Sequence, residues 1–167
     1  MAIDLDKIEL RKQNVLDLKK KSGLGIDAKA QVVLALDFSG SMNTLYGNGT
    51  VQDVVERVLP FGIAFDDNKE VDFYLFHDGA IKMEKNITLS NLDGYINKRI
   101  IGHYQMGGTN YAPVLEKLDD LEGRTIDNVN FLKVSNIATI PDNQLYGGLM
   151  AEYPDWVSQA KGLNLID

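Results

Sequence analysis

The segment Val32–Leu36 consists of five apolar residues in a row, with no alternation of polar side chains. Such a run is typical of a strand whose two faces are both buried, as at the centre of a parallel sheet. The rest of the sequence alternates strand-like and helix-like segments. We therefore predict an α/β fold with a mostly parallel sheet, with Val32–Leu36 as a central strand and with helices on both faces.

Oxygen-bearing side chains follow this strand directly. Asp37, Ser39 and Ser41 stand at spacings of two, with a glycine between the serines that permits a tight turn. In open α/β sheets ligands bind at the C-terminal ends of the strands, and a carboxylate with two hydroxyls suits a hard cation such as Mg²⁺ or Mn²⁺. A second loop, Met106–Asn110, places Thr109 before a predicted helix. Taken alone, this second loop would be a Gly-Gly turn with Thr109 as an ordinary capping residue, and a metal role for Thr109 depends on its pairing with the first loop.

These two loops resemble those of von Willebrand factor A (VWA) domains, in which an Asp-x-Ser-x-Ser loop and a later threonine hold a metal ion. The longer stretch of sequence from Leu5–Ile8 to Tyr153–Trp156 resembles the sequences of the VWA proteins of bacterial tellurium-resistance operons. The resemblance implies a Rossmann-like sheet and a metal-ion-dependent adhesion site. That site would bind Mg²⁺, with Mn²⁺ or Ca²⁺ as alternatives.

The resemblance also implies a role for each residue of the site. Ser39, Ser41 and Thr109 would supply hydroxyl oxygens, and Asp37 would act mainly through water and by orienting the serines. A carboxylate from a partner protein would fill the remaining position. The expected function is therefore that of a protein-binding module associated with tellurium resistance or stress response, with no catalytic residues.

After the second loop the sequence departs from the family pattern. A VWA domain would continue into a further buried strand, whose terminal aspartate belongs to a third metal loop. Here Pro113–Gly123 runs directly into Arg124–Asn128 and a predicted strand, Val129–Val134. Two strands and a helix, on the order of 50 residues, are therefore expected to be missing, with the junction at Leu115–Glu116. The sequence leaves open whether the segment is deleted or omitted from the chain as given.

The remaining elements follow from hydrophobic periodicity and turn signals. We predict an N-terminal helix and linker over residues 1–27 and a VWA-like domain over residues 28–167. The predicted helices are Leu5–Lys21, Val51–Phe65, Thr88–Ile101, Asn110–Leu121 and Asp142–Ala160. Strands Val71–Phe76 and Ala80–Met83 are joined by His77–Gly79, whose Asp-Gly pair favours a hairpin. Asp142 is expected to cap the last helix, and Lys19–Lys21 to form a solvated helix end.

Net charge, cysteine content and the length of the apolar runs exclude several classes of function. A net charge of −7 repels phosphate backbones, so we expect no nucleic-acid partner. The chain has no cysteine, which excludes disulfides, thiolate metal sites and a cysteine nucleophile. Its apolar runs are too short to span a membrane, and its first residues do not resemble a secretory signal. These features favour a cytoplasmic location and leave the oligomeric state open.

Two other functions compete with metal-dependent binding. Asp37 could be the nucleophile of a phosphohydrolase, but such enzymes need a second carboxylate where this chain has Ser39. The second alternative is a metal-free structural remnant. The only histidines, His77 and His103, are interpreted as structural or solvent-facing, and Trp156 as a packing residue.

Overall fold

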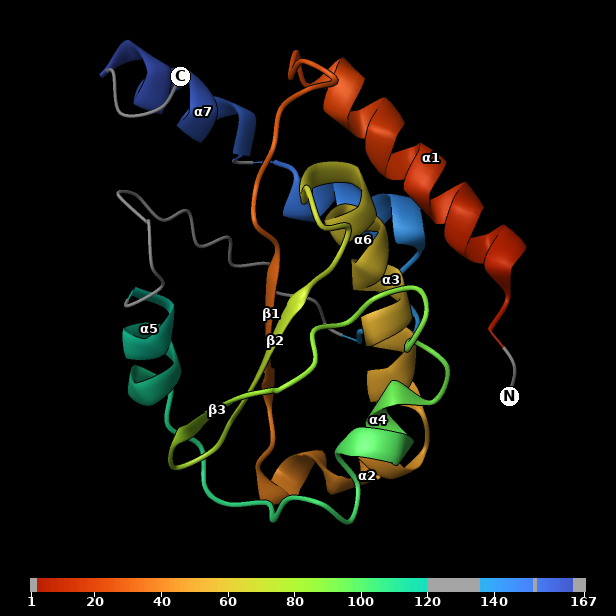
Figure 1. The fold of residues 1–167 in the computed structure, drawn as a ribbon, viewed down its shortest axis with the longest axis vertical. Helices are drawn as coiled ribbons and strands as arrows, with labels where there is room; N and C mark the ends of the chain where they lie inside the picture. The colour runs from red at the N-terminus through yellow and green to blue at the C-terminus, as the bar shows by residue number, and fades with distance from the viewer. Residues whose placement is uncertain (1–2, 120–135, 152, 164–167) are drawn as a thin grey trace.

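The computed structural model describes residues 3–119, 136–151 and 153–163 of the chain. Over these residues the fold is α/β, with a small mixed sheet and helices around it (Figure 1). The elements are α1 Leu5–Lys21, β1 Val33–Asp37, the short 3-10 helix η1 Gly40–Met42, α2 Asn43–Gly47, α3 Thr50–Phe65, β2 Asp72–Phe76, β3 Ala80–Lys82, α4 Tyr95–Arg99, α5 Ala112–Asp119, α6 Asp142–Leu149 and α7 Tyr153–Gly162.

The sheet has the strand order β1-β2-β3. Strand β1 pairs in parallel with β2, with Val33 opposite Asp72 and Asp37 opposite Phe76. Strand β3 returns antiparallel to β2, as the hairpin signal predicts. The prediction that β1, the strand before the two serines, pairs in parallel with another strand is therefore confirmed.

The central position predicted for Val32–Leu36 is not seen among the described strands, and the predicted strand Val129–Val134 lies outside them. Among the described strands β1 lies at one edge of the sheet and β2 is the middle strand. All five residues of β2 are buried, whereas all five residues of β1 are only partly buried. The physical reason is that β2 has a strand on each side, while β1 pairs with β2 alone among the described strands.

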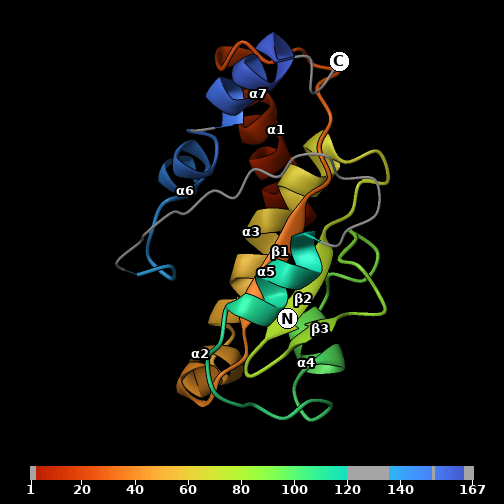
Figure 2. The same ribbon diagram turned by 90° about the vertical axis from the view of Figure 1, so that its left-hand side faces the viewer.

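Helices cover both faces of the sheet, as predicted. On one face Phe73 and Leu75 pack in the main hydrophobic core with Val55 and Leu59 of α3. On the opposite face Tyr74 and Phe76 pack with Val114 of α5. Figures 1 and 2 show α3 and α1 on one side of β1 and β2, and α5 on the other. The alternation of side chains along β2 thus divides the core into two layers.

The N-terminal helix is confirmed over the predicted residues, and its buried side includes two charged residues. Leu5 is 60 % exposed, whereas Arg11 and Lys19 are buried. The ammonium of Lys19 donates to the carbonyl oxygens of Ala28 and Ala64 and lies 4.4 Å from the centroid of the Phe65 ring. The expectation of a fully solvated lysine run is therefore wrong, because Lys19 uses carbonyl groups in place of water.

Two predicted helices differ from the prediction in the structure, one shorter and one divided. Only Tyr95–Arg99 of the predicted segment Thr88–Ile101 is helical, since Gly94 adopts φ +60° and begins a new turn there. The predicted last helix is divided into α6 and α7, with Pro154 in the first turn of α7, where a missing N–H is tolerated.

The structure contains a short helix that the sequence analysis does not predict, α2, directly after the first loop. Helix α3 begins at Thr50 and passes through Pro60 without ending, as its apolar pattern indicates. The predicted strand Val129–Val134 and the side chain of Trp156 lie outside the described residues.

Candidate metal centre

The first loop of the predicted site begins where β1 ends. The N–H of Ser39 donates to Oδ1 of Asp37 at 2.8 Å, and the phenol of Tyr46 donates to the backbone oxygen of Asp37 at 2.9 Å. Burial, together with the nearby Asp37 carboxylate, raises the pKa of Tyr46, so its phenol keeps the proton that it donates. The loop is therefore held by hydrogen bonds within itself and to α2.

The two serine hydroxyls of this loop are close to each other. Oγ of Ser39 lies 3.1 Å from Oγ of Ser41, and Ser39 is buried while Ser41 is exposed. In an octahedral Mg²⁺ site with ligands at about 2.1 Å, adjacent oxygens are about 3.0 Å apart. The spacing of the two hydroxyls fits two adjacent ligands of such an ion, and without an ion the same spacing is a hydroxyl–hydroxyl hydrogen bond.

The second loop is attached to the first by backbone hydrogen bonds. The N–H of Gly40 donates to the oxygen of Gly107 at 3.1 Å, and the N–H of Gly107 donates to the oxygen of Phe38 at 3.3 Å. These bonds form an isolated parallel bridge between Ser39 and Gly107. In Figures 1 and 2 the chain between α4 and α5 accordingly passes the end of β1.

Three of the predicted site residues lie together because they are close in the sequence: Asp37 ends β1, and Ser39 and Ser41 follow it. Thr109 is exposed and lies two residues after Gly107, so its loop is adjacent to the serines. Among the described residues, no group of three or more histidine, cysteine, aspartate and glutamate side chains could hold a metal. The predicted centre is of another kind, with three hydroxyls and one carboxylate.

The two histidines occupy the positions expected of structural or solvent-facing residues. Nδ1 of His77 accepts the N–H of Asp78 at 2.7 Å within the β2–β3 turn. His103 is exposed. Sequence reasoning assigned Asp78 only to the Asp-Gly hairpin turn, and its carboxylate also accepts the N–H of Gly108 at 2.8 Å. The sequence signal for that contact is the Gly-Gly pair, which allows another group to approach the backbone closely.

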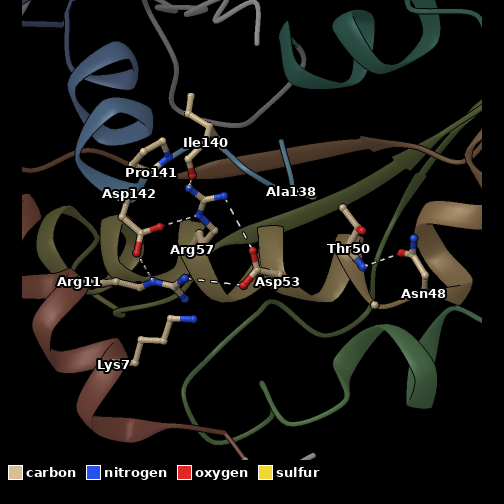
Figure 3. Close-up of a pocket in the computed structure, with 11 residues that line it drawn as sticks. Lys7, Arg11, Asn48, Thr50, Asp53, Arg57, Ala138, Ile140, Pro141 and Asp142 are labelled. Carbon is tan, nitrogen blue, oxygen red and sulfur yellow. Dashed lines mark hydrogen bonds and ion pairs between the residues drawn. The ribbon is translucent and has the colours of Figure 1, made fainter. Parts of the chain in front are cut away.

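A second cluster of charged side chains lies away from this centre. Oδ2 of Asp142 accepts Nε of Arg11 at 2.8 Å, and Oδ1 of Asp142 accepts Nε of Arg57 at 2.7 Å (Figure 3). Arg57 also donates to the backbone oxygens of Ile137 and Ile140. The cluster therefore joins α1, α3 and the chain at the start of α6.

Asp142 does not cap α6, contrary to the prediction, because both of its carboxylate oxygens bind arginines. Burial opposes ionisation, but the hydrogen bonds and charges of Arg11 and Arg57 outweigh it and hold the pKa of Asp142 below its ordinary value. An open surface depression of about 520 Å³ beside these residues is lined by Lys7 and Asp53 as well. We interpret the cluster as a structural clasp. Its sequence signal is the charged Arg11, which lies one helical turn from each of the buried apolar residues Ile8 and Val15 of α1.

A parallel β1–α3–β2 unit, with hydroxyl and carboxylate side chains in the loop after β1 and in an adjacent loop, agrees with the VWA-type class of domain. The model of one family, vWA found in the TerF C terminus, matches residues 29–114 and 103–166. The chain belongs to this family. No helix in the described ranges is long and apolar enough to cross a membrane.

One relative aligns with nearly the whole chain. It is the uncharacterized protein YcbR of Bacillus subtilis, 30 % identical over 220 residues, with 95 % of this chain and 90 % of that protein covered. The covered part of this chain is about 159 residues, so about 60 of the 220 positions have no residue in this chain. The two ranges matched by the family model overlap at residues 103–114. No solved structure matches the chain.

Proposed function

We propose that this protein is a metal-ion-dependent protein-binding module. In this proposal Ser39, Ser41 and Thr109 contribute hydroxyl oxygens to Mg²⁺ or Mn²⁺, with Ca²⁺ as an alternative, and Asp37 orients the serines and supplies negative charge. The observation that carries the proposal is the 3.1 Å separation of the serine hydroxyls in a loop bridged to Gly107. A hard cation is the ligand that this set of donors favours.

The bound ion would act as a bridge to another protein. Mg²⁺ prefers six oxygens, and the three hydroxyls leave positions for water and for a carboxylate of the partner. No turnover is needed for such a bridge. By family membership we propose a role in tellurium resistance or a related stress response, in the cytoplasm.

We also propose that this chain lacks two strands and a helix of the complete family fold. The roughly 60 alignment positions without a counterpart here support this proposal, since about 50 residues are expected for such a segment. The overlap of the matched ranges ends next to the junction expected at Leu115–Glu116. In this proposal the missing segment includes the third-loop aspartate, so metal affinity is expected to be weak.

The metal proposal makes a direct prediction about affinity. Wild-type protein should bind Mn²⁺ weakly, and Ser39→Ala or Thr109→Ala should weaken binding by about tenfold or more, because each removes a ligand oxygen. Asp37→Asn should cost at least as much, because it also removes the negative charge. Titration followed by the relaxation rate of water protons around Mn²⁺ measures these affinities.

Thr44→Ala is the matched control for this titration. Thr44 is an exposed hydroxyl three residues after Ser41 and is not assigned to the site. The control should bind Mn²⁺ like the wild type, and circular dichroism should show that all variants are folded. Equal affinities for wild type, Ser39→Ala, Thr109→Ala and Asp37→Asn would leave the metal-free remnant as the better interpretation.

The phosphohydrolase alternative is expected to fail. The second position after Asp37 carries Ser39, which is buried and hydrogen-bonded to Ser41, instead of a carboxylate for acid–base catalysis. We expect no steady-state hydrolysis of p-nitrophenyl phosphate with Mg²⁺ present. A turnover that wild-type protein performs and Asp37→Asn has lost would contradict this prediction.

A further inference from the structure

The turn between β2 and β3 holds the loop of Thr109 at two points. The N–H of Gly108 donates to Oδ2 of Asp78 at 2.8 Å. The N–H of Asn110 donates to the backbone oxygen of His77 at 2.8 Å. Thr109 stands between these two hydrogen bonds, so the turn restrains the backbone on both sides of it.

The contact with Asp78 depends on glycine. A Cβ atom on Gly107 would overlap Oδ2 of Asp78, and a Cβ atom on Gly108 would overlap Oδ1. Both glycines have ordinary, non-positive φ angles, so close approach and not backbone conformation is what requires them. The Gly-Gly pair thus provides the space in which the carboxylate lies against the loop.

The opposite side of the loop is held by the serine segment through the bridge between Ser39 and Gly107. The loop therefore lies between two anchors, the end of β1 and the β2–β3 turn. The side chain of Asp78 is 73 % exposed, so it contributes little to the packing of the core. Its described contacts are with the loop and with His77 of the same turn.

We propose that Asp78 is a positioning residue for the metal centre. By accepting the N–H of Gly108, it sets the place of Thr109 relative to Ser39 before the ion binds. The inference rests on the proposed function, since the hydroxyl of Thr109 matters only if it is a ligand. It gives a hydrogen-bonding role to an aspartate of the hairpin turn, and it does not make Asp78 a ligand.

The test uses two substitutions that separate hydrogen bonding from charge. Asp78→Ala removes the acceptor, and we expect Mn²⁺ binding to weaken about fivefold and exchange of the Gly108 amide to accelerate by about the same factor. Asp78→Asn keeps an acceptor oxygen and loses the charge, so it should rescue both measurements to near the wild-type values. Glu84→Gln, an exposed acidic residue after β3, controls for the loss of one negative charge.

The outcomes separate this inference from the function on which it rests. If wild-type protein binds Mn²⁺ no better than Ser39→Ala, the proposed function fails and the inference fails with it. If wild-type protein binds Mn²⁺ and Asp78→Ala is unchanged in affinity and in Gly108 exchange, only the positioning role fails. Asp78→Asn behaving like Asp78→Ala in the titration would mean that charge, and not the hydrogen bond, is what Asp78 supplies, which also overturns the inference.

Discussion

Replacement of Asp142 with alanine is expected to lower the free energy of unfolding by about 3 kcal/mol. The side chains of Arg11 and Arg57 are 4 % and 3 % exposed, and both donate Nε to this carboxylate. Removal of Asp142 would leave these two buried guanidinium groups with only the longer ion pairs to Asp53, at 3.7 Å and 3.8 Å, among the carboxylates of the described residues. Asp142 itself is 27 % exposed, which admits some water and keeps the expected value at the lower end of the range for broken buried pairs.

Chemical denaturation of wild type and Asp142→Ala measures this effect. Asp155→Ala is the control, because Asp155 is an exposed carboxylate in the first turn of α7 and should cost little when removed. If the free energies of unfolding of Asp142→Ala and Asp155→Ala differ by less than about 0.5 kcal/mol, Asp142 does not stabilise the fold by holding Arg11 and Arg57.

The same carboxylate predicts a dependence of stability on pH. The pKa of Asp142 is lowered in the folded state, so its contribution is present above the unfolded pKa, near 3.9, and is lost as the pH falls through the lower folded value. Wild-type protein should therefore lose stability below about pH 4. Asp142→Asn should show a smaller loss over this interval, because it has no proton to bind there. Denaturation curves at several acidic pH values would reveal the difference.

Gly62→Ala is the second substitution with a large expected effect, a destabilisation of about 3 kcal/mol from overpacking. A Cβ atom at this position of α3 would overlap the backbone oxygen of Glu70 and would lie 2.8 Å from Cγ2 of Val71. The backbone cannot retreat easily, because Val71 and Ile87 exchange two hydrogen bonds of 2.9 Å. The helix would have to move away from the strand that follows.

Gly147→Ala is the matched control for this substitution. Gly147 is also helical, and a Cβ atom there would meet nothing within 4 Å. The control should be neutral or more stable by up to about 1 kcal/mol, because alanine favours the helix over glycine. Thermal unfolding of both variants compares them, and equal melting temperatures would show that α3 can shift without cost.

The sequence by itself determined the features that depend on local chemistry. The apolar run before Asp37 predicted β1, periodicity predicted α1 and α3, and the Asp-Gly pair predicted the β2–β3 hairpin. The two loop motifs predicted which residues to consider as metal ligands. The predictions of strand, helix and hairpin are confirmed, because strand, helix and turn preferences are properties of a few neighbouring residues.

Only the tertiary structure decided how distant residues combine. It placed β1 at the edge of the described sheet, turned Asp142 from a predicted cap into the partner of Arg11 and Arg57, and brought Asp78 against the loop of Thr109. Asp142 is 131 residues from Arg11 and Asp78 is 30 residues from Gly108. No local sequence pattern predicts such pairs, because the donors that reach each carboxylate come from segments that only the folded chain brings together.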